Sequence, residues 1–171
     1  MAMCEFNIRE LSEIYDLDNP IILFLDGLQD PGNMGTIIRT ADAFNIDGII
    51  LGQGSVDPYN LKVVRATMGS IFRVPLYICD NSLETIMGLK TRGFNLLATS
   101  LEGSLIYDSD FKGKIISVIG NEANGVSPDI LKEADKCIKI PMPGNAESLN
   151  AGVAASIIMY EAMRSRKSNC D

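Results

Sequence analysis

Histidine is missing from this sequence of 171 residues. The cysteines are scattered and form no C-x-x-C pair, so the usual zinc ligand sets cannot be assembled and no metal site is expected. The cysteines are expected to be reduced, and Cys79 and Cys137 are expected to lie in the core. The absence of histidine also removes the commonest general base of enzymes. Any catalysis must therefore rely on arginine, lysine, carboxylate, serine, tyrosine or cysteine side chains.

Long apolar runs are also missing, since the purely apolar stretches are only a few residues long. A membrane-spanning helix, which needs about 20 mainly apolar residues, is therefore not expected. The segment from Met1 to Asn7 lacks a basic region followed by an apolar stretch. We therefore expect no secretory signal and take the cytoplasm as the default location. A hydrophobic content of 46% indicates a globular chain, for which we expect a short N-terminal extension (1–20) and one domain (21–171).

The charge of the chain is acidic overall, at −7. This balance argues against a protein that binds nucleic acid with its whole surface. The positive charge is nevertheless uneven: between Pro58 and Cys79 the chain carries Lys62, Arg65 and Arg73 and no acidic residue. Taken alone, this segment is better explained as an ordinary solvated face.

Short apolar runs alternate along the chain with helical spacing. They predict strands at 21–25, 48–51, 74–78, 95–99, 115–119 and 137–140, and helices at 33–44, 60–67, 82–92 and 149–164. This alternation predicts an α/β fold with a mostly parallel sheet and flanking helices. Physical rules alone favour an unknotted, doubly wound sheet. The chain has neither G-x-G-x-x-G after the first strand nor G-x-x-x-x-G-K-[ST], which disfavours dinucleotide-binding and nucleotide-hydrolysing sites.

Three segments contain more polar residues than the fold alone requires. Residues 140–150 (IPMPGNAESLN) form a Pro/Gly-rich loop that leads into the last helix, where Ser148 and Asn150 could serve simply as caps. Residues 33–44 (NMGTIIRTADAF) and 119–127 (IGNEANGVS) place further polar residues at loop and helix starts. In order and spacing, the three segments resemble the signature motifs of the SpoU/TrmH family of RNA ribose 2′-O-methyltransferases, in the SPOUT superfamily.

The resemblance implies a fold, a reaction and a set of site residues. The fold is the SPOUT fold, whose C-terminal third forms a deep trefoil knot, and the enzyme is a homodimer with its active site at the subunit interface. The reaction is transfer of a methyl group from S-adenosylmethionine to a ribose 2′-hydroxyl of structured RNA (tRNA or rRNA). The implied cofactor-binding residues are Thr99, Leu101, Gly120, Ile140, Met142 and Leu149. The implied catalytic residues are Asn33, Arg39, Glu122, Ser148 and Asn150, and the RNA contact is assigned to Arg39, Lys62, Arg65 and Arg73.

The roles of individual residues stay open at this point. A guanidinium is a poor proton acceptor, so we expect Arg39 to stabilise the developing alkoxide and the neighbouring phosphate rather than act as the base. Asn33 could cap its helix or contact substrate. Glu122 could favour a helix start electrostatically, or it could order Arg39 or the loops of the site.

Some features depart from the family pattern. Ala123, Asn124 and Val126 replace commoner residues of the second motif, and Ala151 and Gly152 do so in the third, which affects specificity more than catalysis. Many rRNA-directed relatives carry an N-terminal RNA-binding domain, which slightly favours tRNA as the target here. Two other functions remain open: a catalytically silent SPOUT-fold RNA-binding module, which would not need the catalytic set, and a small-molecule methyltransferase.

Overall fold

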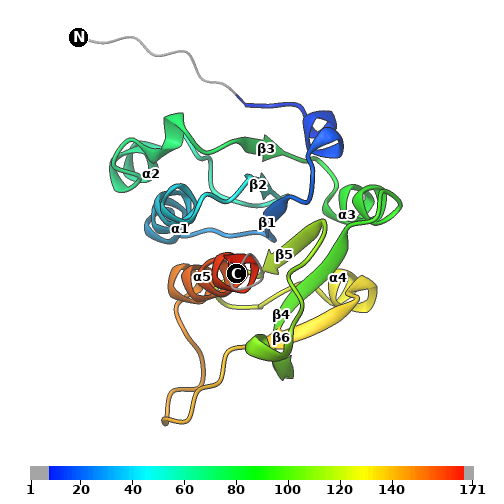
Figure 1. The fold of residues 1–171 in the computed structure, drawn as a ribbon. Coiled ribbons are helices and arrows are strands. Elements are labelled where there is room, and N and C mark those ends of the chain that lie inside the picture. The colour runs from blue at the N-terminus through cyan, green and yellow to red at the C-terminus, as the bar shows by residue number, and fades with distance from the viewer. Residues whose placement is uncertain (1–7, 168–171) are drawn as a thin grey trace, which may run out of the picture.

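Six parallel strands form one sheet in the computed structural model, which describes residues 8–167 (Figure 1). The strands are β1 (Ile21–Leu25), β2 (Gly48–Leu51), β3 (Leu76–Ile78), β4 (Asn95–Leu105), β5 (Ile115–Ile119) and β6 (Lys136–Lys139), in the spatial order β3-β2-β1-β5-β4-β6. Every residue of β1, β2 and β5 is buried. Strands covered on both faces are uniformly apolar, which explains the short apolar runs in the sequence.

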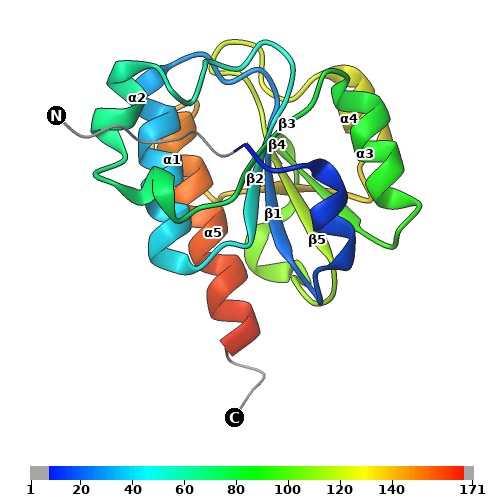
Figure 2. The same cartoon turned by 90° about the horizontal axis from the view of Figure 1, so that it is seen from above.

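Helices cover both faces of the sheet (Figure 2). One layer contains α1 (Pro31–Phe44), α2 (Leu61–Ala66), α5 (Ala151–Lys167) and the 3-10 helix η2 (Ser70–Phe72). The other contains α3 (Ser82–Lys90), α4 (Pro128–Glu133) and the 3-10 helix η1 (Leu11–Asp16), and a third 3-10 helix, η3 (Ile106–Asp108), follows β4. Two clusters of buried apolar side chains lie between the sheet and these layers. The predicted α/β class with a parallel sheet is confirmed.

The element bounds differ from the sequence predictions in informative places. β1, β2 and β5 have the predicted bounds, whereas β4 continues to Leu105, six residues beyond the predicted end. The ladder between β4 and β6 is irregular: Thr99 and Ser104 both pair with Ile138, so residues 100–103 bulge out of the sheet. The short elements η1 and α4 were not predicted, although η1 places Ile14 fully inside the core.

Cys79 is buried in the core as expected, whereas Cys137 is only half-buried and lies outside the core clusters. Cys4 and Cys170 lie outside the described residues. Within residues 8–167, no helix is long and apolar enough to cross a membrane. The same residues contain no group of three or more His, Cys, Asp or Glu side chains that could hold a metal ion.

Candidate active site

Glu122 joins two segments that are far apart in the sequence. It lies in the turn after β5, and its carboxylate accepts hydrogen bonds from the backbone N–H groups of Gln29 (3.1 Å) and Asp30 (2.9 Å) and from Nδ2 of Asn33 (3.0 Å). Partial burial raises the pKa of Glu122, but the hydrogen bonds from Asn33, Asp30 and Gln29 outweigh it and leave the pKa below its ordinary value. Glu122 is therefore held as a carboxylate that orders the loop between β1 and α1.

Asn33 is part of the first turn of α1 and is only 6% exposed. The N-cap is Asp30, whose carboxylate accepts from the backbone N–H of Asn33 at 2.7 Å, and Pro31 occupies the first helical position. The interpretation of Asn33 as a helix cap is thus wrong. Because its Nδ2 donates to Glu122, the Oδ1 of Asn33 stays available as an acceptor.

The start of α5 lies directly against Asn33. Asn150 caps this helix: its Oδ1 accepts from the backbone N–H groups of Gly152 (2.9 Å) and Val153 (3.2 Å). A Cβ at Gly152 would lie 3.2 Å from Oδ1 of Asn150 and 3.3 Å from Oδ1 of Asn33. The two amides therefore flank Gly152 so closely that a larger residue there would require them to shift by a few tenths of an ångström. Ser148 is exposed and makes no hydrogen bond among residues 8–167, so capping falls to Asn150 alone.

Arg39 lies two turns into α1 and is exposed. Within the described part of the chain it makes no hydrogen bond or ion pair. The proposed ordering of Arg39 by Glu122 is not observed, since the partners of Glu122 are Asn33 and the loop before α1. No carboxylate of residues 8–167 therefore pairs with the charge of Arg39.

The turn after β5 contains contacts that sequence reasoning missed. Asn121 donates from Nδ2 to the carbonyl of Gly27 (2.8 Å), and Asp26 accepts from the backbone N–H of Ser127 (2.7 Å). Both contacts tie this turn to the end of β1, beside the Glu122 contacts. The pair Asp30-Pro31 was a readable signal, because Asp at an N-cap followed by Pro is a common helix start. Asn121 gave no comparable signal.

Gly120 has a structural explanation of its own. A Cβ at this position would overlap the backbone of Gly125 and Val126. Asn121 and Gly125 exchange backbone hydrogen bonds of 2.9 Å in each direction, and Gly125 has a positive φ of 69°. Glycine at 120 is therefore required for the close return of the turn. Its predicted contact with a cofactor stays a prediction.

Of the other predicted cofactor residues, Thr99 and Leu101 lie in β4, and the remaining three follow β6. The bulge of β4 carries Leu101, which is exposed, while Ile140, Met142 and Leu149 are half-buried. Among residues 8–167, the backbone and side chains of 141–149 make no hydrogen bond. A loop with unused N–H and C=O groups beside partly uncovered apolar side chains is suited to an adenine ring, which needs both. The residues present therefore fit S-adenosylmethionine in their chemistry.

The predicted RNA-binding cations differ in their surroundings. Lys62 and Arg65 lie exposed on α2. Arg73 instead donates to both carboxylate oxygens of Asp42 at 2.5–3.0 Å, and Ser70 donates to the same carboxylate at 2.8 Å. Hydrogen bonds from Arg73 and Ser70 lower the pKa of Asp42. Arg73 thus serves first to fix η2 against α1.

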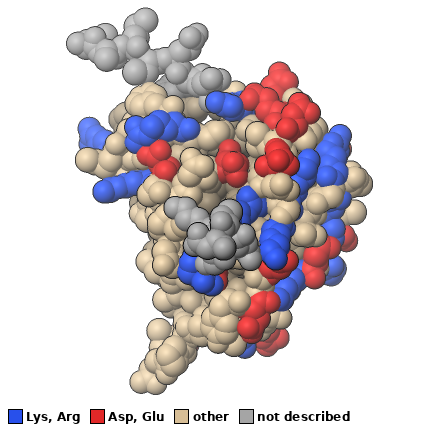
Figure 3. Space-filling view, in the orientation of Figure 1, with Lys and Arg blue, Asp and Glu red and all other residues tan. Residues whose placement is uncertain are grey.

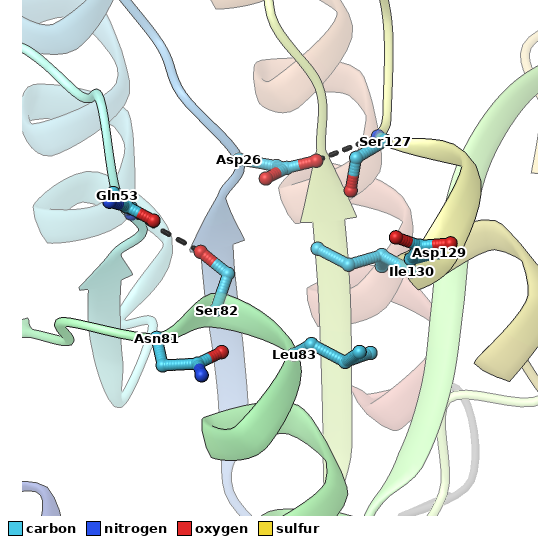
Figure 4. A pocket seen from close by; sticks show the side chains of 8 residues that line it. All are labelled: Asp26, Gln53, Asn81, Ser82, Leu83, Ser127, Asp129 and Ile130. Atoms are coloured by element: carbon cyan, nitrogen blue, oxygen red, sulfur yellow. Dashed lines mark hydrogen bonds between the residues drawn. The ribbon is translucent and has the colours of Figure 1, made fainter.

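A separate polar pocket of about 270 Å³ lies at the carboxyl ends of β1 and β2, on the side of α3 and α4 (Figure 4). Ser82 accepts there from the backbone N–H of Gln53 at 3.2 Å. None of the predicted site residues lines it; its lining residues are Asp26, Gln53, Asn81, Ser82, Leu83, Ser127, Asp129 and Ile130. It is therefore distinct from the cluster of Asn33, Glu122 and Asn150.

Comparison with known proteins identifies the family of the chain. Residues 20–160 match the SpoU rRNA Methylase family, and the chain belongs to that family. Over 140 residues it is 38% identical to the 23S rRNA (guanosine(2553)-2′-O)-methyltransferase RlmP of Bacillus subtilis. The matched region covers 81% of this chain and 56% of the relative. The chain thus spans little more than half the length of that relative.

Solved structures give the same result. The SpoU methyltransferase AviRb from Streptomyces viridochromogenes, in complex with AdoMet, is 34% identical with a TM-score of 0.87, covering 95% of this chain and 66% of that one. A structure that concerns the 2-OH methylation of C/U34 on tRNA is 28% identical with a TM-score of 0.79, covering 86% of this chain and 97% of that one. These likenesses confirm the predicted family and fold, while the trefoil knot itself stays a prediction that they support.

Proposed function

We propose that this chain binds S-adenosylmethionine and methylates a ribose 2′-hydroxyl of structured RNA, either tRNA or rRNA, in the cytoplasm. The observation that carries the proposal is the convergence of Asn33, Glu122 and Asn150 from three separate segments, on the helix that also presents an unpaired Arg39. A fold alone does not need a carboxylate with three N–H donors beside two facing amides. The relatives named above support the same reaction.

The cofactor would be held by the bulge of β4 and by the segment after β6. Leu101, Ile140, Met142 and Leu149 supply apolar walls, and the backbone of 141–149 supplies donors and acceptors for the adenine edge. When bound, S-adenosylmethionine supplies an electrophilic methyl group. Isothermal calorimetry in the presence of a chelator should show binding, whereas heat released only after a divalent ion is added would contradict a metal-free site.

Arg39, Asn33 and Asn150 would act on the RNA side. A 2′-hydroxyl is a poor nucleophile until its developing negative charge is stabilised. The guanidinium of Arg39 can provide that charge, and its fork geometry also suits a neighbouring phosphate. Nδ2 of Asn150 is free to donate, because its Oδ1 is engaged by the helix start, and Oδ1 of Asn33 is free to accept. Ser148 lies exposed at the mouth of the same loop.

The enzyme would work as a homodimer formed through α5. The stripe of Leu149, Val153, Ile157 and Tyr160 stays partly or half exposed, and Tyr160 meets Phe44 edge to face with ring centroids 5.8 Å apart. Gly152 and Ala155 are small residues of the same helix, but they are buried inside the chain and do not belong to this exposed stripe. Light scattering at micromolar concentration should give a dimer mass, and a monomer with intact catalysis would contradict this part.

The deciding experiment is incubation with labelled S-adenosylmethionine and total RNA that lacks the modification, followed by mapping of the methylated nucleotide. Label on a ribose 2′-oxygen is the expected result. RNA binding without label would favour the catalytically silent RNA-binding module. Label found only on small molecules would favour a small-molecule methyltransferase.

A further inference from the structure

Three large apolar side chains are left uncovered on the segment from α2 to η2. Leu61, Met68 and Phe72 are 72%, 73% and 65% exposed, respectively. They occur within twelve residues of chain on one side of α1. We call the segment 61–72 the α2–η2 platform. Large apolar side chains exposed together on a soluble protein commonly mark a binding surface.

Met68 also adopts a backbone conformation that methionine disfavours. Its φ is +51°, and the other non-glycine residues with positive φ among residues 8–167 are Asn19 and Asn45. Asparagine tolerates the left-handed region, whereas methionine gains nothing from it locally. The turn of Met68 and Gly69, with φ of 51° and 87°, holds the methionine side chain out in solvent. Strain kept at an exposed apolar residue points to a role in binding.

Positive charge surrounds these side chains. Lys62 and Arg65 are exposed on α2, and from Pro58 to Cys79 the chain has no acidic residue. Lys and Arg side chains gather over α2 at the left of Figure 3. On a chain with a net charge of −7, such a local cluster favours an anionic partner.

The platform flanks Arg39. Gly35, Arg39 and Asp42 are spaced so that they lie on one face of α1. Gly35 is so close to Ala66 that a Cβ would overlap it, and Asp42 accepts from Ser70 at 2.8 Å. Gly35 and Asp42 lie before and after Arg39 on this face, and they contact Ala66 and Ser70. The residues between Ala66 and Ser70 therefore lie beside Arg39, and Met68 is one of them.

We propose that the α2–η2 platform binds the unpaired nucleotides next to the methylated one, with bases stacked on Phe72 and Met68 and phosphates held by Lys62 and Arg65. This inference rests on the proposed function and adds a surface that reads single-stranded RNA. Aromatic stacking and basic side chains together are the usual means of binding unpaired nucleotides. A two-fold contact between copies would instead bring the same cations face to face, and α5 offers an apolar stripe for that contact.

The test compares two platform variants with one control. Met68→Asn replaces the apolar side chain with a residue that tolerates the left-handed conformation, so the melting temperature should not fall. Phe72→Ala removes the ring from an exposed position. Met87→Ala, on α3 at the opposite face, removes an exposed methionine and serves as the control. The probes are a labelled, short oligouridylate, a duplex of equal length, and total RNA as methyl acceptor.

Each platform variant should raise the Kd for the oligouridylate and the KM for RNA about tenfold. The Kd for S-adenosylmethionine, the single-turnover rate at saturating RNA and duplex binding should change little, and Met87→Ala should match the wild type. Unchanged Kd and KM, no binding of the oligouridylate by the wild type, or a dimer that becomes a monomer in the variants would each overturn the platform. A wild type that binds the oligouridylate and the cofactor but methylates no RNA would overturn the proposed function and leave the platform to be judged on binding.

Discussion

Replacing Glu122 with glutamine tests the central contact of the site with little change in shape. The carboxylate accepts from Gln29 at Oε2 and from Asp30 and Asn33 at Oε1. A glutamine has one acceptor oxygen and one NH2 group. With its oxygen in the place of Oε1, it keeps two of these contacts as neutral hydrogen bonds. Its NH2 then faces the N–H of Gln29, where two donors oppose each other.

The expected loss of stability follows from the number of hydrogen bonds that are lost or weakened. One charge-assisted hydrogen bond is lost, and two are weakened by loss of the charge. Such bonds contribute roughly 1.5–3 kcal/mol when buried, but the carboxylate is partly solvated, so water offsets much of the loss. We expect Glu122→Gln to lower the free energy of unfolding by about 1–2 kcal/mol, which shifts the Tm by roughly 2–4 °C per kcal/mol. Because the contact that anchors Asn33 is weakened to a neutral hydrogen bond and the loop before α1 loses its bond from Gln29, kcat should fall about 10- to 100-fold.

The effect on stability should depend on pH. The folded-state pKa of Glu122 is lowered, so its contribution is fully present above the unfolded pKa, near about 4.3, and is lost as the pH falls through the lower folded pKa. The difference in unfolding free energy between wild type and variant should therefore be constant near neutral pH and shrink in acid. Urea unfolding from neutral pH to acid measures it, with exposed Glu84→Gln on α3 as control.

Two results would refute this reasoning. An unfolding difference that stays constant through acid pH would show that the carboxylate charge is not what stabilises the loop. A variant with normal kcat but weakened cofactor binding would place Glu122 in the cofactor site instead of the RNA side.

The remaining predictions concern helix α1 and its neighbours. Arg39→Ala should leave cofactor affinity within a few-fold and reduce the single-turnover rate about 10²-fold or more, and Arg39→Lys should be nearly as damaging because a point charge lacks the planar fork; near-normal turnover with lysine would contradict the assignment. Gly35→Ala should destabilise the fold by about 1–3 kcal/mol through its clash with Ala66, and Ala66→Gly added to it should restore part of the loss in thermal unfolding. Arg65→Ala should weaken RNA binding and lower its salt dependence by about one phosphate contact. Arg73→Ala should mainly lower the Tm, since Arg73 is bound to Asp42, and equal RNA losses in the two variants would refute the distinction.

Local sequence pattern was sufficient for the buried part of the fold. The runs at 21–25 and 115–119 are uniformly apolar, because both strands are covered on both faces, and periodicity reports burial directly. Prediction from local pattern failed where a strand pairs with residues that are distant in the sequence. Residues 100–105 contain serine, glutamate and glycine, and they join β4 only because Ser104 and Leu105 meet β6 beyond a bulge.

The site shows the same division. The start of α1 was predicted two residues too late, although Asp30 and Pro31 carry a local start signal. Resemblance supplied Asn33 and Glu122 as site residues but not the bond between them, which spans 89 positions of the sequence. No local pattern reports a contact between residues so far apart. The sequence left open whether Glu122 orders Arg39 or the loops of the site, and the folded chain shows that it holds the loop before α1.

The pairing of charges explains how an acidic chain can present an RNA site. Two carboxylates at α1 are already engaged: Glu122 accepts from three N–H groups, and Asp42 accepts from Arg73 and Ser70. Neither carboxylate forms an ion pair with Arg39, which lies on the helix between their contacts. An arginine paired with a carboxylate would have to break that pair before it could meet a phosphate or an alkoxide, and catalysis would bear that cost in every turnover. Because these carboxylates are engaged by N–H donors and Arg73, they leave the charge of Arg39 available for the RNA contact that we propose.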